Sequence, residues 1–329
     1  MKLDGLPLRR LLAECKSFVE AYSGMYPNFV LGKDVDESVT PVFFYHRTDA
    51  ALFRQHLQHL KTNGYVTLTC DELYETIRNP HLADRRKIVL TFDDGLDDLY
   101  SVVYPLLREF RLTAVAYIVP AWIGNKGFLT WRQVREMHES GFVDFQSHSM
   151  SHSSIFTSPK IVDFFHPHYV RYAPWDIPRM AKANGDIVEE GSPDYGTPIY
   201  TWKSRLSDSP RYLPEARVQE LCVSHVANNG GERFFEKPGW RSGLRKLTAS
   251  FFRDTCRTDR YEDDVQQQHS IRSEIELSKQ TMEDRLSGKV VRHFAFPWHQ
   301  SGEWARRALL KASFTMQCDR LATKPAKSR

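Results

Sequence analysis

The sequence contains few cysteines, and no two of them lie close together in the chain. Its five cysteines, Cys15, Cys70, Cys222, Cys256 and Cys318, lie far apart in the 329-residue chain, and no two form a C-x-x-C arrangement. An odd and scattered set of this kind argues against a disulfide framework and indicates reduced thiols. We therefore expect a cytoplasmic protein.

Long apolar runs and a strong net charge are also absent. No stretch reaches the roughly 18–20 apolar residues that a membrane-spanning helix needs. Residues 1–18 lack an uninterrupted apolar core and a small-residue cleavage site, so they predict an amphipathic helix and not a signal peptide. The net charge of +4, from 45 basic and 41 acidic residues, is too small and too scattered to indicate nucleic-acid binding.

Strand and helix patterns alternate from residue 41 onward. The segments typical of buried strands are 41–46, 65–69, 87–92, 113–119, 142–148, 290–297 and 313–318. The segments with helical periodicity are 51–64, 71–78, 96–110, 130–141, 272–288 and 302–312, with Asp71 as a plausible helix cap. This alternation predicts an α/β fold with a parallel sheet, open or closed into a barrel, whose functional groups lie at the carboxyl ends of its strands.

The alternation is interrupted between residues 154 and 269. This stretch is rich in proline, tyrosine, tryptophan and arginine, and it is too long to be a plain loop. We predict an inserted subdomain at 154–269, mainly helical and irregular. The barrel then comprises residues 40–153 and 270–320, and residues 1–39 form an N-terminal helical extension.

Two adjacent carboxylates follow the strand that ends at residue 92. Asp93 and Asp94 can face different ways at this strand end, so that one binds a cation while the other works as a base. Gly95 permits a sharp turn into the next helix. The alternative is that the pair is only an acidic helix start, favoured by the helix dipole. Asp97 and Asp98 lie in the first helical turn and are expected only to stabilise it.

Two histidines follow the strand at 142–148. His148 and His152 stand at positions i and i+4, a spacing that suits a helical turn presenting both imidazoles to one metal ion. Because parallel strands end at one edge, the carboxylate pair is expected nearby. A set of two histidines and one carboxylate leaves positions open for water and substrate, as a hydrolytic metal site requires.

The stretches TFDDG and HSMSH resemble, in order and spacing, the first two motifs of the polysaccharide deacetylases, carbohydrate esterase family 4. The resemblance implies that Asp93 is the general base and that Asp94, His148 and His152 bind one divalent ion, with zinc expected. It also implies a distorted (β/α) barrel and an enzyme that removes N-acetyl groups from an amino sugar of a glycan or glycan precursor, releasing acetate.

Two further stretches, FFYH and FAFPWH, resemble one branch of this family, the circularly permuted poly-N-acetylglucosamine deacetylases. The resemblance implies that His46 is the catalytic acid, that Trp298 lines the site, and that the Trp298 backbone amide helps to hold the oxyanion. His46 could instead only cap a strand, and Trp298 could only pack. His299 stands where glycine is usual, so it could reshape the turn or supply another proton donor. The resemblance covers about 40–153 and 270–318.

The insertion is rich in aromatic residues, whose faces can stack on sugar rings or form the core of a small subdomain. They include Trp175, Tyr195, Tyr200, Trp202, Tyr212 and Trp240. Two other functions fit the same sequence. One is an O-acetyl esterase, or a hydrolase of non-sugar amides, on the same metal site. The other, a glycan-binding protein without turnover, is disfavoured because a binder does not need the full acid–base set.

Overall fold

The computed structural model describes residues 40–82, 84, 86–169, 193–256, 258–319 and 322–325. The helix expected within residues 1–39 lies outside this part of the chain, as does Trp175. Among the described residues, no helix has the length and apolar character needed to cross a bilayer.

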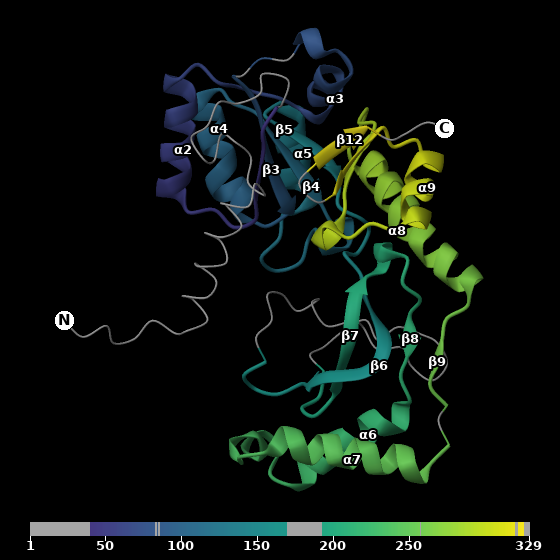
Figure 1. The fold of residues 1–329 in the computed structure, drawn as a ribbon. Coiled ribbons are helices and arrows are strands. Elements are labelled where there is room, and N and C mark those ends of the chain that lie inside the picture. Colours follow the sequence, from purple (N-terminus) through teal and green to yellow (C-terminus); the bar gives the residue numbers. More distant parts are fainter. Residues whose placement is uncertain are drawn as a thin grey trace, which may run out of the picture.

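A curved sheet is the central element of the fold (Figure 1). Its strands are β1 (Val42–Tyr45), β2 (Val66–Thr67), β3 (Lys87–Asp94), β4 (Ala114–Ile118), β5 (Val143–Ser147), β10 (His293–Ala295), β11 (Met316–Asp319) and β12 (Ala322–Pro325). Their order is β1-β3-β4-β5-β10-β11-β12, and β2 also pairs with β3. Every pair is parallel except β11 with β12. The predicted α/β class with a distorted barrel is thus confirmed; no described strand pair joins β12 to β1, so the barrel is open.

Helices flank this sheet. The longer ones are α2 (Ala50–Thr62), α3 (Cys70–Arg78), α4 (Tyr104–Phe110), α5 (Trp131–Glu139), α8 (Asp264–Arg285) and α9 (Glu303–Lys311). The chain also contains shorter helical segments, η1 (Pro80–Leu82), η2 (Leu99–Val103), η3 (Pro120–Trp122), η4 (Arg205–Ser207), η5 (Gly231–Glu236) and η6 (Pro297–His299), of which η5 packs away from this sheet. Apolar faces of the helices share one core with the strands, as Phe53 of α2, Ile275 of α8 and Phe92 of β3 illustrate. Burying each such side chain contributes roughly 1.5–3 kcal/mol.

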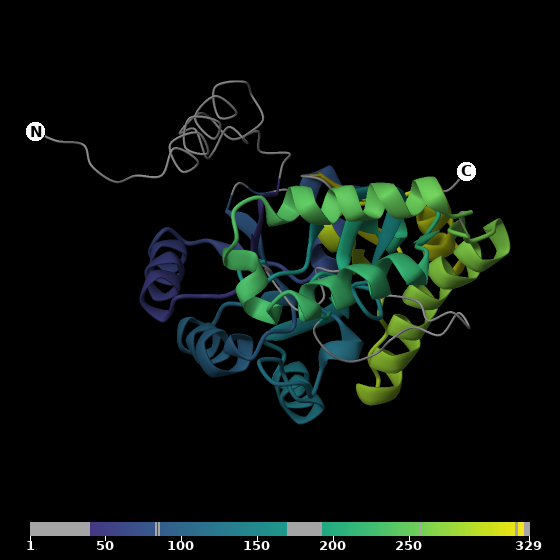
Figure 2. The same ribbon diagram turned by 90° about the horizontal axis from the view of Figure 1, so that it is seen from below.

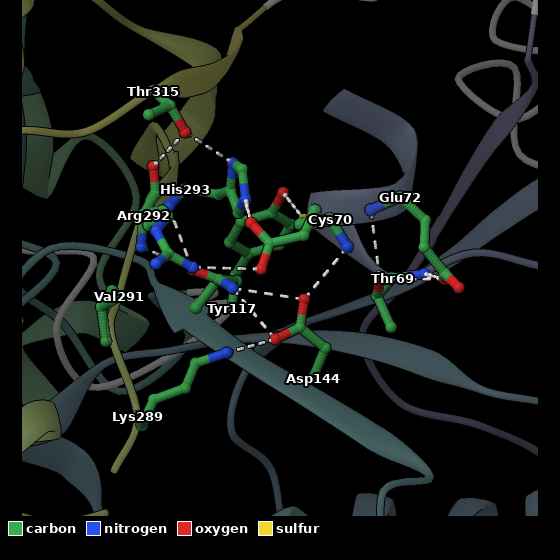
Figure 3. Close-up of polar contacts among 12 residues, drawn as sticks. Thr69, Cys70, Glu72, Tyr117, Asp144, Lys289, Val291, Arg292, His293 and Thr315 are labelled. Carbon is green, nitrogen blue, oxygen red and sulfur yellow. Dashed lines mark hydrogen bonds and ion pairs between the residues drawn. The ribbon is translucent and has the colours of Figure 1, made fainter. Parts of the chain in front are cut away.

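Helix α3 closes the end of the sheet at which β5 and β10 begin (Figure 3). Asp144 of β5 accepts hydrogen bonds from the Lys289 ammonium group, at 2.5 Å, and from the backbone N–H of Cys70, at 3.0 Å. The imidazole of His293 contacts Asp71 at 2.8 Å and is fully buried. The expected cap at Asp71 was therefore wrong: Thr69 caps α3, because its hydroxyl accepts a hydrogen bond from the first turn. The opposite end of the sheet remains available for a site.

The segment after β5 contains strands that the sequence did not predict. Strand β6 (Ser154–Phe164) pairs with β7 (Pro198–Ser204), and β8 (Tyr212–Leu213) pairs with β9 (Arg260–Tyr261), all antiparallel. The expectation of a mainly helical and irregular segment did not include these strands. Register shifts interrupt the β6–β7 ladder on both sides of Ile161, so the period-two pattern of a regular strand is lost.

Two helices complete this part of the molecule, α6 (Ala216–Asn228) and α7 (Trp240–Asp254). They lie beyond the β6–β7 pair, farthest from the central sheet (Figure 1). Figure 2 shows the same helices, in green, in front of the sheet when the molecule is seen from below. The β6–β7 pair therefore lies between these helices and the sheet.

The β6–β7 part is fixed to the chain that follows β10. The N–H of Ser204 donates to the side-chain oxygen of Gln300 at 2.9 Å. Asp208 caps α9 from a distance in the sequence, because its carboxylate accepts the N–H of Trp304 at 2.6 Å. A side chain at Gly302 would collide with the Asp208 carboxyl group in its present position, so it would displace this cap. These contacts hold β7 beside the turn η6.

Candidate metal centre

Asp94, His148 and His152 come together at the carboxyl edge of the sheet. Asp94 is the last residue of β3, and the two histidines follow β5, with β4 between these strands. One ligand atom from each residue lies within 4.8 Å of the others. The Nε2 atoms of His148 and His152 lie 3.7 and 3.8 Å from Asp94 Oδ1. Two ligands of a tetrahedral zinc ion lie roughly 3.3 Å apart, so this spacing fits a metal with little movement.

Both imidazoles are prepared for coordination. Nδ1 of His148 donates its hydrogen to the backbone carbonyl of Ala295 at 2.9 Å, which leaves the lone pair on Nε2. Burial lowers the pKa of His148 to about 3 and also lowers the pKa of His152, so both rings are neutral. A neutral imidazole is the form that binds a metal. Nδ1 of His152 is buried and has no hydrogen-bond partner among the described residues.

The spacing of the two histidines predicted a helical turn between them, and this prediction was wrong, because the turn is not helical. Ser149 and His152 adopt left-handed backbone conformations, with φ of 69° and 51°. The N–H of His152 donates to the Ser149 hydroxyl at 3.0 Å, and the carbonyl of Met150 accepts from the N–H of Ala121 at 3.0 Å. The two histidines at i and i+4 do come together, but it is an irregular turn that brings their rings to 5.0 Å from one another.

Asp93 lies beside the cluster and is almost fully buried, with 8% of its surface exposed. Burial, reinforced by the neighbouring charge of Asp94, raises the pKa of Asp93 to about 8. A bound cation would favour the ionised carboxylate instead. Asp94 and Gly95 both have positive φ, of 74° and 78°, and a side chain at Gly95 would press on Ile118. Glycine therefore allows the sharp turn that separates the two carboxylates.

His46 follows β1 and reaches the same edge of the sheet. Its Nε2 lies 4.0 Å from Asp94 Oδ2, and 53% of its side chain is exposed. Partial burial lowers the pKa of His46. This placement next to the cluster agrees with the predicted location, while the role of His46 as an acid remains a prediction.

Asp97 and Asp98 hold the segment that carries His46. Asp98 Oδ2 accepts a hydrogen bond from the backbone N–H of Thr48 at 2.7 Å, and Asp97 Oδ1 accepts one from Arg47 at 3.3 Å. Asp98 precedes η2 but makes no side-chain cap hydrogen bond there. The expectation that these aspartates only stabilise a helix start was therefore wrong. They connect the β3 and β1 ends of the site, a link that sequence spacing did not reveal.

Trp298 and His299 lie on η6, and both have left-handed backbone conformations, with φ of 51° and 56°. The Trp298 ring lies 4.1 Å from the ring of His152 and 5.3 Å from that of Trp202. The His299 ring lies 5.6 Å from that of Phe44. Both residues thus border the cluster, and their predicted roles toward substrate and oxyanion remain predictions.

Most aromatic residues between β5 and α8 form a local core. Tyr200 and Tyr212 are fully buried in one apolar cluster, which Tyr195 also contacts. Trp240 packs against a second cluster. Trp202 of β7 packs against the same cluster as Tyr200, and its ring also lies 5.3 Å from that of Trp298, which borders the candidate metal centre. The sequence showed Trp202 only as one of several aromatic residues of the insertion and did not distinguish it from the others.

Known proteins of one family are similar to this chain in sequence. Residues 82–188 match the family model described as polysaccharide deacetylase. The poly-beta-1,6-N-acetyl-D-glucosamine N-deacetylase of Escherichia coli (strain K12) is 32% identical over 201 residues, which cover 56% of this chain and 25% of that protein. The protein of the same name from Staphylococcus epidermidis is 28% identical over 102 residues, covering 30% of this chain and 35% of that protein.

A solved structure has the same fold. The de-N-acetylase from Aggregatibacter actinomycetemcomitans superimposes with a TM-score of 0.50 at 18% identity, over 84% of this chain and 86% of that chain. The fold is therefore that of the deacetylases. The sequence similarity to the polysaccharide deacetylase domain lies in residues 82–188. It spans 25–43% of the length of the curated relatives named here and of a further relative from Bacillus subtilis.

Proposed function

We propose that this protein is a metal-dependent hydrolase that removes N-acetyl groups from amino-sugar residues of a glycan and releases acetate. The observation that carries the proposal is the convergence of Asp94 with two neutral imidazoles within 4.8 Å, at the edge of the sheet where β3 and β5 end. Zinc is the proposed ion, because one carboxylate and two imidazoles with an open position are a common catalytic zinc set. The match to the polysaccharide deacetylase model supports the same reaction.

The chemistry divides between the ion and the side chains around it. When bound, a divalent ion supplies Lewis-acid polarisation of the acetamide carbonyl and lowers the pKa of water. In the proposed reaction Asp93 accepts a proton from the attacking water, and the backbone N–H of Trp298 donates to the developing oxyanion. His46 donates a proton to the nitrogen as the C–N bond breaks, because an amine leaves poorly until it is protonated. His299 is the alternative donor. The products are acetate and a free amino sugar.

The proposed substrate is a glycan that contains N-acetylglucosamine. The printed names of the Escherichia coli and Staphylococcus epidermidis relatives support this choice. Trp298 beside the proposed ligand His152, and Trp202 beside Trp298, add support, because aromatic faces pack against the apolar faces of sugar rings. An O-acetyl esterase or a non-sugar amide hydrolase would use the same cluster, so the test must separate these reactions.

Two further proposals concern the whole chain. Residues 40–153 and 270–320 form the barrel and 154–269 an inserted subdomain; α8 crosses the later boundary, so the two parts share a helix. Cytoplasmic localisation is proposed from the odd and scattered set of five cysteines in the sequence.

Acetate release from matched substrates tests the proposed reaction. The zinc-loaded protein is incubated with N-acetylglucosamine, with its β-1,6-linked oligomers, with O-acetylated sugars that lack an acetamide, and with N-acetylated amines that are not sugars. We expect acetate and an equal amount of free amine from the N-acetylated sugars. Acetate only from the O-acetylated sugars, or only from the non-sugar amides, would assign the site to one of the alternatives.

A further inference from the structure

Glu274 of α8 contacts the turn that joins the two candidate ligand histidines. Its carboxylate accepts two hydrogen bonds from Ser151, one from the backbone N–H at 2.9 Å and one from the hydroxyl group at 2.5 Å. Its backbone carbonyl accepts the N–H of Met150 at 2.8 Å. Hydrogen bonds to an ionised carboxylate are stronger than those between neutral groups, so this one residue restrains two successive residues of the turn.

A second contact from α8 lies one helical turn further on. The hydroxyl groups of Ser278 and Ser147 are 2.7 Å apart, and both side chains are fully buried. Ser278 donates its own hydrogen to the carbonyl of Ile275 at 2.8 Å, so Ser147 is the donor in the contact with Ser278. Because Ser147 directly precedes His148, α8 holds the chain on the N-terminal side of the first histidine as well. Figure 1 shows α8 running beside the sheet from the β8–β9 region.

The turn needs such restraint. Ser149 and His152 have φ of 69° and 51°, a region that side-chain-bearing residues rarely occupy unless their surroundings fix them. Glu274 lies 123 residues from Ser151 in the sequence, on a different element, and does not belong to the ligand cluster. Its contacts reach the backbone immediately before His152.

We infer that Glu274 is a positioning residue that clamps the Ser149–Ser151 turn and thereby sets the metal affinity of the site without ligating the ion. The inference rests on the proposed metal site. Partners that orient metal ligands commonly contribute roughly 10–100-fold to metal affinity. A clamp of this kind acts on the position of His152, so its loss weakens metal binding even where the fold is intact.

The test measures the zinc dissociation constant of the metal-free chain by competition with a chromophoric chelator. Glu274→Ala is expected to bind zinc about 10–100-fold more weakly than wild type. Glu274→Gln should lose less, because its amide can accept from the Ser151 N–H and donate to the Ser151 hydroxyl. Glu276→Ala, on an exposed position of the same helix, is the matched control and should bind as wild type does.

Thermal unfolding of the metal-free variants separates positioning from stability. Ser151→Ala removes one hydrogen bond of the clamp with a one-atom change, and it carries the test if Glu274→Ala does not fold. The double variant Glu274→Ala/Ser151→Ala should lose less binding free energy for zinc than the two single variants lose together, because both changes remove the same contact.

Three results would overturn the inference. The first is a wild-type zinc affinity in both Glu274→Ala and Ser151→Ala. The second is an equal loss of zinc affinity in Glu274→Gln and Glu274→Ala. The third is a loss of zinc affinity that only follows the drop in melting temperature from one variant to the next. Each of these leaves the metal site in place. A wild-type chain that binds no zinc would instead contradict the proposed function, and the inference with it.

Discussion

Asp93 and Asp94 are neighbours in sequence, yet their replacement should have different consequences. Asp94→Asn keeps the size of the side chain, and asparagine tolerates the left-handed conformation at φ 74° as aspartate does. The backbone should therefore be unchanged, while the charge 3.7–3.8 Å from both imidazoles is lost. Asp93→Asn leaves all three proposed ligands in place and removes only the proposed base.

The expected magnitudes follow from these roles. Loss of a direct ligand should weaken zinc binding by more than the roughly 10–100-fold that is typical of residues behind the ligands. Loss of a general base lowers turnover by roughly 10²–10⁴-fold. Asp93→Asn should therefore bind zinc with a much smaller change in affinity than Asp94→Asn, and should release acetate far more slowly even when saturated with zinc.

Two measurements on the same preparations test this division of roles. The zinc dissociation constant is obtained by chelator competition, and acetate release is measured at saturating zinc. Excess zinc should restore activity to Asp94→Asn in part and to Asp93→Asn not at all. Equal losses of zinc affinity in the two variants, or full activity of zinc-saturated Asp93→Asn, would refute the assignment.

Three further predictions concern single residues. His46→Ala should leave zinc affinity unchanged and slow amide hydrolysis strongly, but should slow hydrolysis of an activated aryl ester less, because that leaving group needs no proton; equal losses on both substrates would exclude an acid role. In metal-free protein the pKa of Asp93 is raised to about 8, so the folded chain binds a proton that the unfolded chain has lost, and stability falls as pH rises from about 4 to about 8. Asp93→Asn should therefore melt higher than wild type at pH 8 and show a smaller difference at pH 5; the same difference at both values would contradict the shift. Glu262→Ala should destabilise the fold by about 3–5 kcal/mol in urea unfolding, because it removes the ion-pair partner, at 2.6 Å, of the fully buried Arg205; a loss near zero would show that the charge is compensated elsewhere.

The sequence was informative where the periodicity of buried strands was clear. Each strand expected in the central sheet is present, because continuous apolar runs bounded by helical patterns are typical of parallel strands. Asp94, His148 and His152 could be grouped for the same reason, since the ends of parallel strands share an edge. Helix α8 begins at residue 264, earlier than predicted. The sequence did not indicate this start, because the first turns of the helix are polar and bury Gln267 instead of an apolar side chain.

Features that depend on contacts between distant segments were not predictable. The bulges of β6 remove its alternation, and the left-handed conformations at Ser149 and His152 leave no mark in the spacing of the histidines. The hydrogen bond from Thr48 to Asp98 joins residues 50 positions apart, and neither residue has a pattern that indicates it. Tertiary contacts, and not local propensity, determine these parts of the site.

In the proposed function, Asp94, His148 and His152 hold the ion on which deacetylation depends. Its most direct test is a titration of metal-free protein with zinc, in which bound zinc and acetate release from an N-acetylglucosamine oligomer are followed together, with the His148→Ala/His152→Ala variant in parallel. We predict that activity rises with zinc and reaches its plateau at one bound ion per chain, while the variant neither binds this ion nor releases acetate. Acetate release that is independent of zinc, or wild-type zinc binding in the variant, would contradict it.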